Sequence, residues 1–268
     1  MKKIGMAVLA TVLALQVGAQ ELFVRQGFSG YAPIKMTSLE VVGREATVGG
    51  YPMLQTGLDL KFLTANVFSS TGVVLPMGQI IVGAHREKKL LFMMNMRTNL
   101  EQNRAQSWND DPCKRTDLLW KRATGGIQDV NCATINHGAN FLRNPSGNFA
   151  KADFELKEAA IETPATVIQV AFDRLGRNMQ YLSYIVQINP EQFGFERDSS
   201  AWATNSWHKD RIAKDPKKLE FIARLVKWAE DVQSRMEPAF QKDPNAFSSL
   251  ASLDSYLTEK SSVAAAKP

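Results

Sequence analysis

The most chemically reactive side chains in this sequence belong to two cysteines, Cys113 and Cys132, and three histidines, His85, His137 and His208. Cysteine and histidine can hold a metal ion or act in nucleophilic catalysis, and a pair of cysteines can form a disulfide. The spacing of these residues and the cellular compartment of the chain decide between these chemistries.

The two cysteines favour a disulfide. An even cysteine count in a secreted chain is typical of disulfide bonding, and two cysteines allow one intramolecular pairing. A zinc site needs about four ligands at close spacing, and His137 is the one further candidate near Cys132. A cysteine nucleophile needs a free thiolate, an orienting partner and an oxyanion site. We therefore predict a disulfide between Cys113 and Cys132, with no metal and no cofactor.

The most distinctive local composition lies in residues 198–210, DSSAWATNSWHKD, where two tryptophans and a histidine alternate with small polar residues. One interpretation is a ligand-binding platform, because tryptophan faces stack on sugar rings while asparagine and serine bind hydroxyl groups. The alternative is a loop that buries Trp202 and Trp207 at the edge of the core. The candidate ligand-binding residues are Trp202, Asn205, Trp207 and His208.

Catalytic motifs are absent from the sequence. It contains no G-x-x-x-x-G-K-[ST] or G-x-G-x-x-G phosphate-binding loop, no H-E-x-x-H zinc motif and no G-x-S-x-G nucleophile elbow. Acidic pairs such as Asp110 with Asp111, or Glu196 with Asp198, have the chemistry for glycoside hydrolysis. Solvated loop acids and turn caps are the more frequent role of such residues. We predict no catalytic residue.

The elements that must position these residues are mostly strands. Apolar or alternating runs in residues 39–48, 58–68 and 78–97 are separated by Gly, Pro, Ser and Thr, which indicates strands. In the last run, the polar residues 85–89 predict a hairpin loop. A further strand is expected over residues 129–136, which carry Cys132.

The clearest hairpin lies in the second half of the sequence. Residues 166–175 and 179–190 are rich in β-branched and aromatic side chains and flank a short Gly-Arg-Asn turn. Residues 117–122 are compatible with either a helix or a strand, and so are residues 152–163. The Asn, Pro, Ser and Gly content of residues 141–149 predicts a loop.

One long helix is expected to begin at Pro216, after the N-cap residue Asp215, and to stop at Pro238. Apolar residues recur within it at three- and four-residue steps: Leu219, Ile222, Leu225, Val226, Ala229, Val232 and Met236. Glu220 and Arg224 can pair on its solvent side. A helix with one apolar stripe must pack on another element. We therefore predict an α+β fold, mainly an antiparallel β-sheet with a long C-terminal amphipathic helix packed on it.

Residues 1–19 have the layout of a secretory signal peptide. Lys2 and Lys3 precede an apolar run that extends to Val17, and small or β-branched residues occupy the cleavage positions before Gln20. This run is shorter than the ~20 residues that a membrane span needs, which disfavours an uncleaved anchor. We expect cleavage near Ala19, a periplasmic or secreted protein, and no transmembrane segment after cleavage.

The rest of the chain is expected to form a single secreted α+β domain over residues 20–242, with a weakly ordered tail over residues 243–268. The hydrophobic content of 44% is sufficient for a core, and the net charge of +5 is too small to indicate nucleic-acid binding. We predict a bacterial cell-envelope protein that binds or supports an envelope protein or polymer without catalysis. The alternative is a periplasmic hydrolase acting on a glycan or ester.

Overall fold

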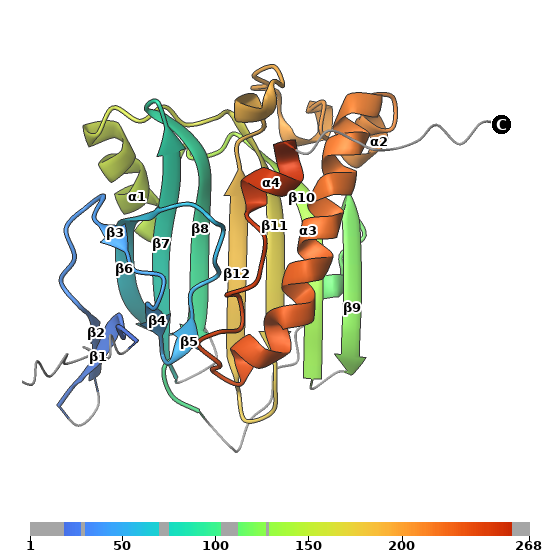
Figure 1. Cartoon of the computed structure of the whole chain (residues 1–268). Coiled ribbons are helices and arrows are strands. Elements are labelled where there is room, and N and C mark those ends of the chain that lie inside the picture. The colour runs from blue at the N-terminus through green and yellow to red at the C-terminus, as the bar shows by residue number, and fades with distance from the viewer. Residues whose placement is uncertain (1–18, 28–29, 70–74, 103–111, 127–128, 259–268) are drawn as a thin grey trace, which may run out of the picture.

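A computed structural model describes residues 19–27, 30–69, 75–102, 112–126 and 129–258. It contains an eight-stranded antiparallel sheet with a long helix packed on one face, which confirms the predicted α+β class (Figure 1). The signal peptide predicted at the start of the chain lies outside the described residues, except for Ala19. Residues 259–268 of the predicted tail also lie outside them.

The strands of the large sheet lie in the order β3-β6-β7-β8-β12-β11-β10-β9. Their bounds are β3 (Val41–Val42), β6 (Leu60–Ser69), β7 (Pro76–Arg86), β8 (Lys89–Asn99), β9 (Trp120–Gly126), β10 (Asp129–Ala139), β11 (Thr166–Leu175) and β12 (Tyr181–Ile188). Two small ribbons pair β1 (Phe23–Gln26) with β2 (Gly30–Pro33), and β4 (Thr47–Val48) with β5 (Tyr51–Pro52).

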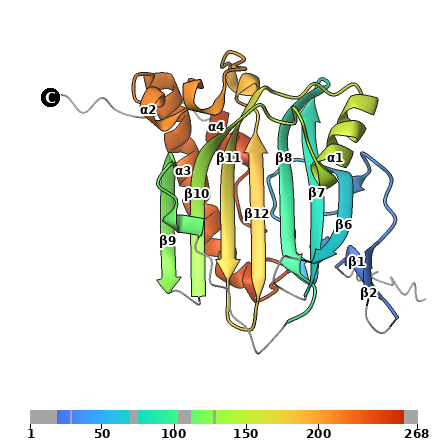
Figure 2. The same ribbon diagram turned by 180° about the vertical axis from the view of Figure 1, so that it is seen from behind.

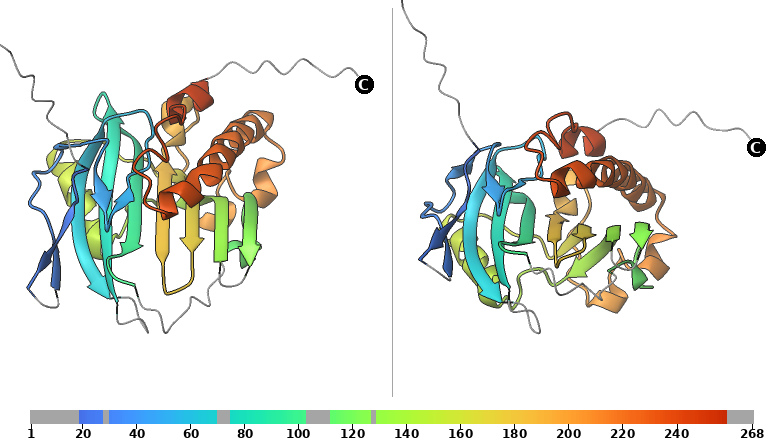
Figure 3. Two further views of the ribbon diagram at one scale, coloured as in Figure 1. Left: turned by 60° about the horizontal axis from the view of Figure 1, so that its bottom comes forward. Right: turned by 90° about the horizontal axis from the view of Figure 1, so that it is seen from below.

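The helical elements include three short 3₁₀ turns. Their bounds are η1 (Pro112–Lys114), α1 (Gly147–Glu158), η2 (Pro190–Phe193), η3 (Trp202–Thr204), α2 (Lys209–Ile212), α3 (Pro216–Phe240) and α4 (Leu253–Thr258). Helix α3 packs on β10 and β11 at one face of the sheet, and α1 packs on β6 and β7 at the other (Figures 1 and 2). The view from below in Figure 3 shows the sheet between these two layers.

The main core lies between α3 and the sheet. Trp228 of α3 is fully buried, and its ring meets Phe172 of β11 edge to face with the ring centroids 5.6 Å apart. A smaller core lies under α1, where Leu156 belongs to one cluster with Ile81 and Met93. Because the larger core is under α3, the attachment of this helix dominates the packing of the molecule.

Three predictions about local structure are confirmed. The hairpin predicted from residues 166–175 and 179–190 is formed by β11 and β12, which pair from Ile168 with Ile188 to Leu175 with Tyr181. The strand predicted over residues 129–136 is β10, which continues to Ala139. The ion pair predicted between Glu220 and Arg224 is present on α3.

The hairpin between β7 and β8 is tighter than predicted. The expected five-residue loop was wrong, because His85 and Arg86 continue β7 and only Glu87 and Lys88 form the turn. Both turn residues have positive φ angles, 48° and 59°. Such a two-residue turn matches the twist of the flanking strands. The polar side chains that suggested a loop are exposed at the strand ends.

Two predicted boundaries of helices were wrong. Helix α1 begins at Gly147, inside the segment predicted to be a loop. Helix α3 passes through Pro238 and ends at Phe240. A proline in the last turn removes a single backbone hydrogen bond, and burial of Phe240 holds this turn against the core. Leu219, the first residue of the predicted apolar stripe, is 43% exposed.

The packed part of the chain extends beyond residue 242, where we expected the domain to end. Phe247 is buried and meets Tyr184 of β12 edge to face, with ring centroids 5.7 Å apart. Leu253 and Leu257 of α4 are also buried in the main core. Residues 243–258 therefore cover part of the sheet beside α3 (Figure 1).

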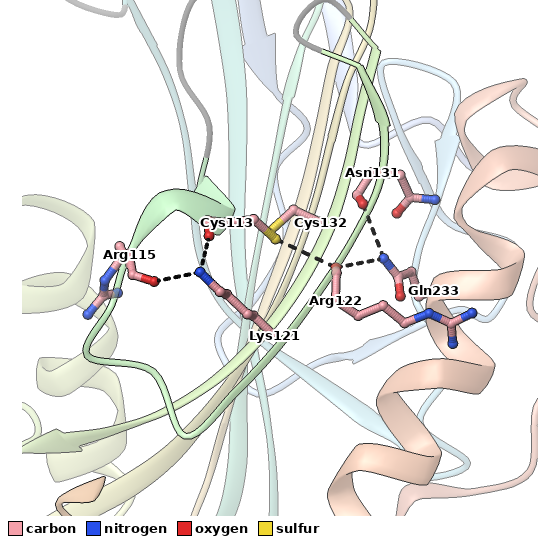
Figure 4. Close-up of a disulfide and its surroundings, with 7 residues drawn as sticks. All are labelled: Cys113, Arg115, Lys121, Arg122, Asn131, Cys132 and Gln233. Carbon is pink, nitrogen blue, oxygen red and sulfur yellow. Dashed lines mark hydrogen bonds between the residues drawn. A yellow bond between two sulfur atoms is a disulfide. The ribbon is translucent and has the colours of Figure 1, made fainter.

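The predicted disulfide between Cys113 and Cys132 is present and joins η1 to β10 (Figure 4). Beside it, the Nζ of Lys121 donates a hydrogen bond to the carbonyl of Cys113, 2.9 Å away. The Nε2 of Gln233 on α3 donates to the carbonyl of Arg122, 3.0 Å away, and thereby ties α3 to β9. Because the sequence contains two cysteines, no thiol remains for a metal site or a nucleophile.

Replacing the N-cap residue of α3 should weaken the fold moderately. The Oδ1 of Asp215 accepts hydrogen bonds from the amides of Lys217, at 3.1 Å, and Lys218, at 3.2 Å. We expect Asp215→Ala to lower the free energy of unfolding by about 1 kcal/mol, measured by urea denaturation. Asp215→Asn keeps the acceptor oxygen and should lose less. Equal stability of the alanine variant and the wild type would show that this cap contributes nothing.

Candidate ligand-binding site at the end of β10

His137 at the end of β10 meets two aromatic side chains of residues 198–210, Trp202 and His208. The ring of His137 lies nearly parallel to that of Trp202, with centroids 5.1 Å apart and an interplanar angle of 19°. The ring of His208 is nearly perpendicular to both, with centroids 4.5 Å from Trp202 and 5.6 Å from His137. We call these three residues the Trp–His cluster. Figure 2 shows α2, which begins directly after His208, beside the end of β10.

The loop that carries Trp202 is held by Asp198. Its carboxylate accepts hydrogen bonds from the amides of Ser200, at 2.9 Å, and Ser206, at 2.7 Å. Partial burial alone raises the pKa of Asp198, but the hydrogen bonds from Ser206 and Ser200 outweigh it and hold the pKa well below its usual range. Asp198 is therefore the turn cap that the sequence suggested. Asp110 and Asp111 lie outside the described residues.

Asn205 and Trp207 support the same loop from inside. Both are fully buried. The Nδ2 of Asn205 donates to the Oγ of Thr166 at 2.8 Å, and its Oδ1 accepts from the amide of Trp207 at 3.0 Å. The ring of Trp207 packs against Phe195 with centroids 4.8 Å apart. The structure thus places these two predicted site residues beneath the loop rather than on its surface.

Trp202 is the exposed member of the cluster. Its side chain is 39% exposed, while His137 and His208 are buried. Of the four predicted ligand-binding residues, the structure brings Trp202 and His208 into contact with each other. The remaining histidine, His85, lies on the distant β7–β8 hairpin and has no part in the cluster.

The hydrogen bonds of the two buried imidazoles define their tautomers. The Nε2–H of His137 donates to the main-chain carbonyl of Trp202, 3.0 Å away, which leaves Nδ1 as an acceptor. This Nδ1 is buried and has no partner among the described residues. In His208, Nδ1 accepts from the amide of Asp210 at 3.3 Å, so the ring proton lies on Nε2. The cluster therefore contains one acceptor and one donor nitrogen beside the indole.

Burial lowers the pKa of His137 below its ordinary value of 6.5, and the neighbouring His208 lowers it further. The hydrogen bond to Trp202 and the carboxylates of Asp117 and Asp198 act in the opposite direction but do not reverse the shift. His137 is thus held in its neutral form by the fold.

Lowering the pH should destabilise the fold, because protonation of the buried His137 is less favourable in the folded protein than in the unfolded chain. The folded protein binds this proton more weakly than the unfolded chain, so the contribution to stability is present above pH 6.5 and is lost as pH falls toward the folded-state pKa. His137→Gln keeps a donor for the Trp202 carbonyl but does not titrate. We expect urea denaturation at neutral pH and at about pH 5 to show a smaller acid-induced loss in this variant than in the wild type. An equal loss in both would contradict the assignment.

The sequence did not indicate that His137 belongs to this site. One signal was available, because Ala133, Ile135 and His137 alternate along one face of β10, and the first two are in the core. That pattern places His137 on the α3 side of the sheet. It carries no information about which residues far along the chain cover it.

The described residues contain no group of three or more His, Cys, Asp or Glu side chains that could hold a metal ion. Within the same ranges, no helix is long and apolar enough to cross a membrane. The intramolecular disulfide is compatible with an extracellular compartment.

No protein-family model, curated protein or solved structure matches this chain. The functional assignment therefore depends on the geometry of the Trp–His cluster.

Proposed function

We propose that this protein is a secreted or periplasmic binding protein of the bacterial cell envelope, without catalysis of its own, and that Trp202 is the contact for its ligand or partner. The signal-peptide pattern of residues 1–19 and the disulfide support an oxidising compartment outside the cytoplasm. In this proposal Trp202 and His208 are the contacting residues, and Asn205 and Trp207 hold the loop in place.

The exposure of Trp202 is the observation that carries this proposal. Tryptophan is enriched among the residues that contribute most to binding, and Trp202 is 39% exposed whereas the neighbouring Trp207 is fully buried. His137 fixes the indole from one side, and Asp198 and Asn205 fix the backbone around it. A rigid aromatic side chain at the surface binds with little loss of conformational entropy.

A hydrolase acting on a glycan or ester is the second candidate. The specific observation in its favour is the Nδ1 of His137, which has no hydrogen-bond partner among the residues that the structure describes and has the chemistry of a general base. This role requires turnover of a glycan or ester by the purified protein and its loss in His137→Gln. Turnover that the variant retains would rule out His137 as the base.

The proposed binding function is tested by chemical crosslinking in intact cells that produce the tagged protein, followed by mass spectrometry of the recovered material. We expect one dominant crosslinked partner, a protein or a glycan, with the wild type and strongly reduced recovery with Trp202→Ala. Phe154→Ala is the matched control, because Phe154 is a 58% exposed aromatic residue on α1. Equal recovery by all three proteins would refute the contact at Trp202.

A further inference from the structure

Among the described residues, no second large apolar side chain is exposed on the loop that carries Trp202. Exposed aromatic anchors in protein interfaces are normally accompanied by further apolar side chains. The loop around Trp202 instead carries Ser200, Thr204 and Ser206, and its apolar neighbours there are the small Ala201 and Ala203. The other large exposed apolar side chains of the described chain lie on other elements: Val24 on β1, Val41 on β3, Phe154 on α1 and Leu219 on α3. A single aromatic face among polar groups is a poor surface for docking a protein.

His208, which contacts the indole, and its neighbour Asp210 supply hydrogen-bonding groups of both kinds. His208 presents its Nε2–H, because Nδ1 is occupied by the amide of Asp210. The carboxylate of Asp210 lies 3.5 Å from that Nδ1, and its side chain is 75% exposed. The donor Nε2–H and the Asp210 carboxylate therefore lie at opposite sides of one imidazole ring, and such a pair suits a ligand with several hydroxyl groups, since each hydroxyl both donates and accepts.

His137 determines which side of Trp202 a ligand can use. Its ring covers one face of the indole and is itself 4% exposed. A ligand ring must therefore stack on the opposite face. The apolar C–H face of a sugar ring matches an indole face, and the hydroxyl groups at its rim match His208 and Asp210.

We infer that the Trp–His cluster binds a saccharide, with a pyranose ring on the open face of Trp202 and its hydroxyl groups on His208 Nε2–H and the Asp210 carboxylate. This inference rests on the proposed function, because it assumes that a ligand binds here. It names the class of ligand, and it assigns a contact to Asp210, which the binding proposal alone does not require.

The test is a titration of the full mature protein with chitotetraose, maltotetraose and tetragalacturonate. Binding is monitored by NMR through the indole N–H resonance of Trp202. We expect saturable shifts at millimolar concentration with at least one of the three. Trp202→Ala and Asp210→Asn should each weaken binding roughly tenfold or more, measured by calorimetry, while Phe154→Ala binds as the wild type does. Asp210→Asn keeps the backbone amide that donates a hydrogen bond to His208 Nδ1. The variant therefore tests the contact between the carboxylate and the sugar without disturbing the loop.

Two results would overturn the saccharide inference: no shift with any of the three sugars, or unchanged affinity in both Trp202→Ala and Asp210→Asn. The crosslinking experiment separates this failure from failure of the proposed function. If the sugars do not bind but recovery of a cellular partner still depends on Trp202, the saccharide class is wrong and the binding function stands. If neither depends on Trp202, both are wrong.

Discussion

Replacing Trp228 with alanine is expected to lower the free energy of unfolding by about 3–5 kcal/mol, because it removes a large side chain from a packed core. Trp228 is fully buried and meets Phe172 edge to face across the interface of α3 and the sheet. The cavity would lie in the main core, where Leu225, Ala229 and Val232 of the same helix are also fully buried. Urea denaturation followed by far-UV circular dichroism measures the loss.

Two variants make this result specific. Lys227→Ala removes an exposed side chain one position earlier on α3 and should leave stability within about 0.5 kcal/mol of the wild type. Trp228→Phe should cost less than the alanine variant, because it keeps an aromatic ring and removes an indole N–H that has no partner within the described chain. A stable Trp228→Ala protein would contradict the packing of α3 on the sheet.

Loss of the disulfide is the second large effect. The double variant Cys113→Ser, Cys132→Ser is expected to be about 3 kcal/mol less stable than the oxidised wild type. The two cysteines are 19 positions apart in the sequence, and closing a loop of this size restricts the unfolded chain. Serine is close to cysteine in size, so the double variant keeps the local packing approximately while it removes the constraint, and the two buried hydroxyl groups add a desolvation cost.

The comparison with reduced wild type separates the crosslink from the substitutions. Wild-type protein denatured in the presence of a thiol reductant should be at least as stable as the double variant, which buries two hydroxyl groups, and the oxidised wild type should be more stable than both. If the oxidised and reduced wild-type proteins unfold at the same urea concentration, the disulfide adds nothing to stability.

Local patterns predicted most of the elements. The long arms around the turn at Gly176 predicted β11 and β12 because β-branched and aromatic residues dominate both arms. Asp215 and Pro216 predicted the beginning of α3 because each satisfies a requirement of the first helical turn. Each of these patterns lies within a few neighbouring residues, so it can be recognised without knowledge of the tertiary structure.

Signals that depend on tertiary packing were missed. Trp228 was absent from the predicted stripe of α3, while the exposed Leu219 was included, because periodicity alone does not fix which edge of a stripe faces the sheet. Phe247 lies in a segment without periodicity, and its burial against Tyr184 depends on chain segments far away in the sequence.

The sequence predicted two of the three residues of the Trp–His cluster. Composition singled out residues 198–210, and these residues do carry Trp202 and His208. Composition does not separate the exposed Trp202 from the buried Trp207, because burial depends on what lies beneath the loop. His137 lies 65 positions before Trp202 in the chain. The alternating pattern of a strand does not show which residue so far away in the sequence will contact it.

Site-specific photocrosslinking in intact cells shows whether Trp202 marks the binding surface. A photoreactive amino acid at the exposed position of Ser200, two residues from Trp202, should give a covalent adduct of defined mass, whether with a protein or a glycan. The same amino acid at the exposed Lys151 on α1 should give none. No adduct at position 200, or equal adducts at both positions, would show that the surface around Trp202 is not the binding surface.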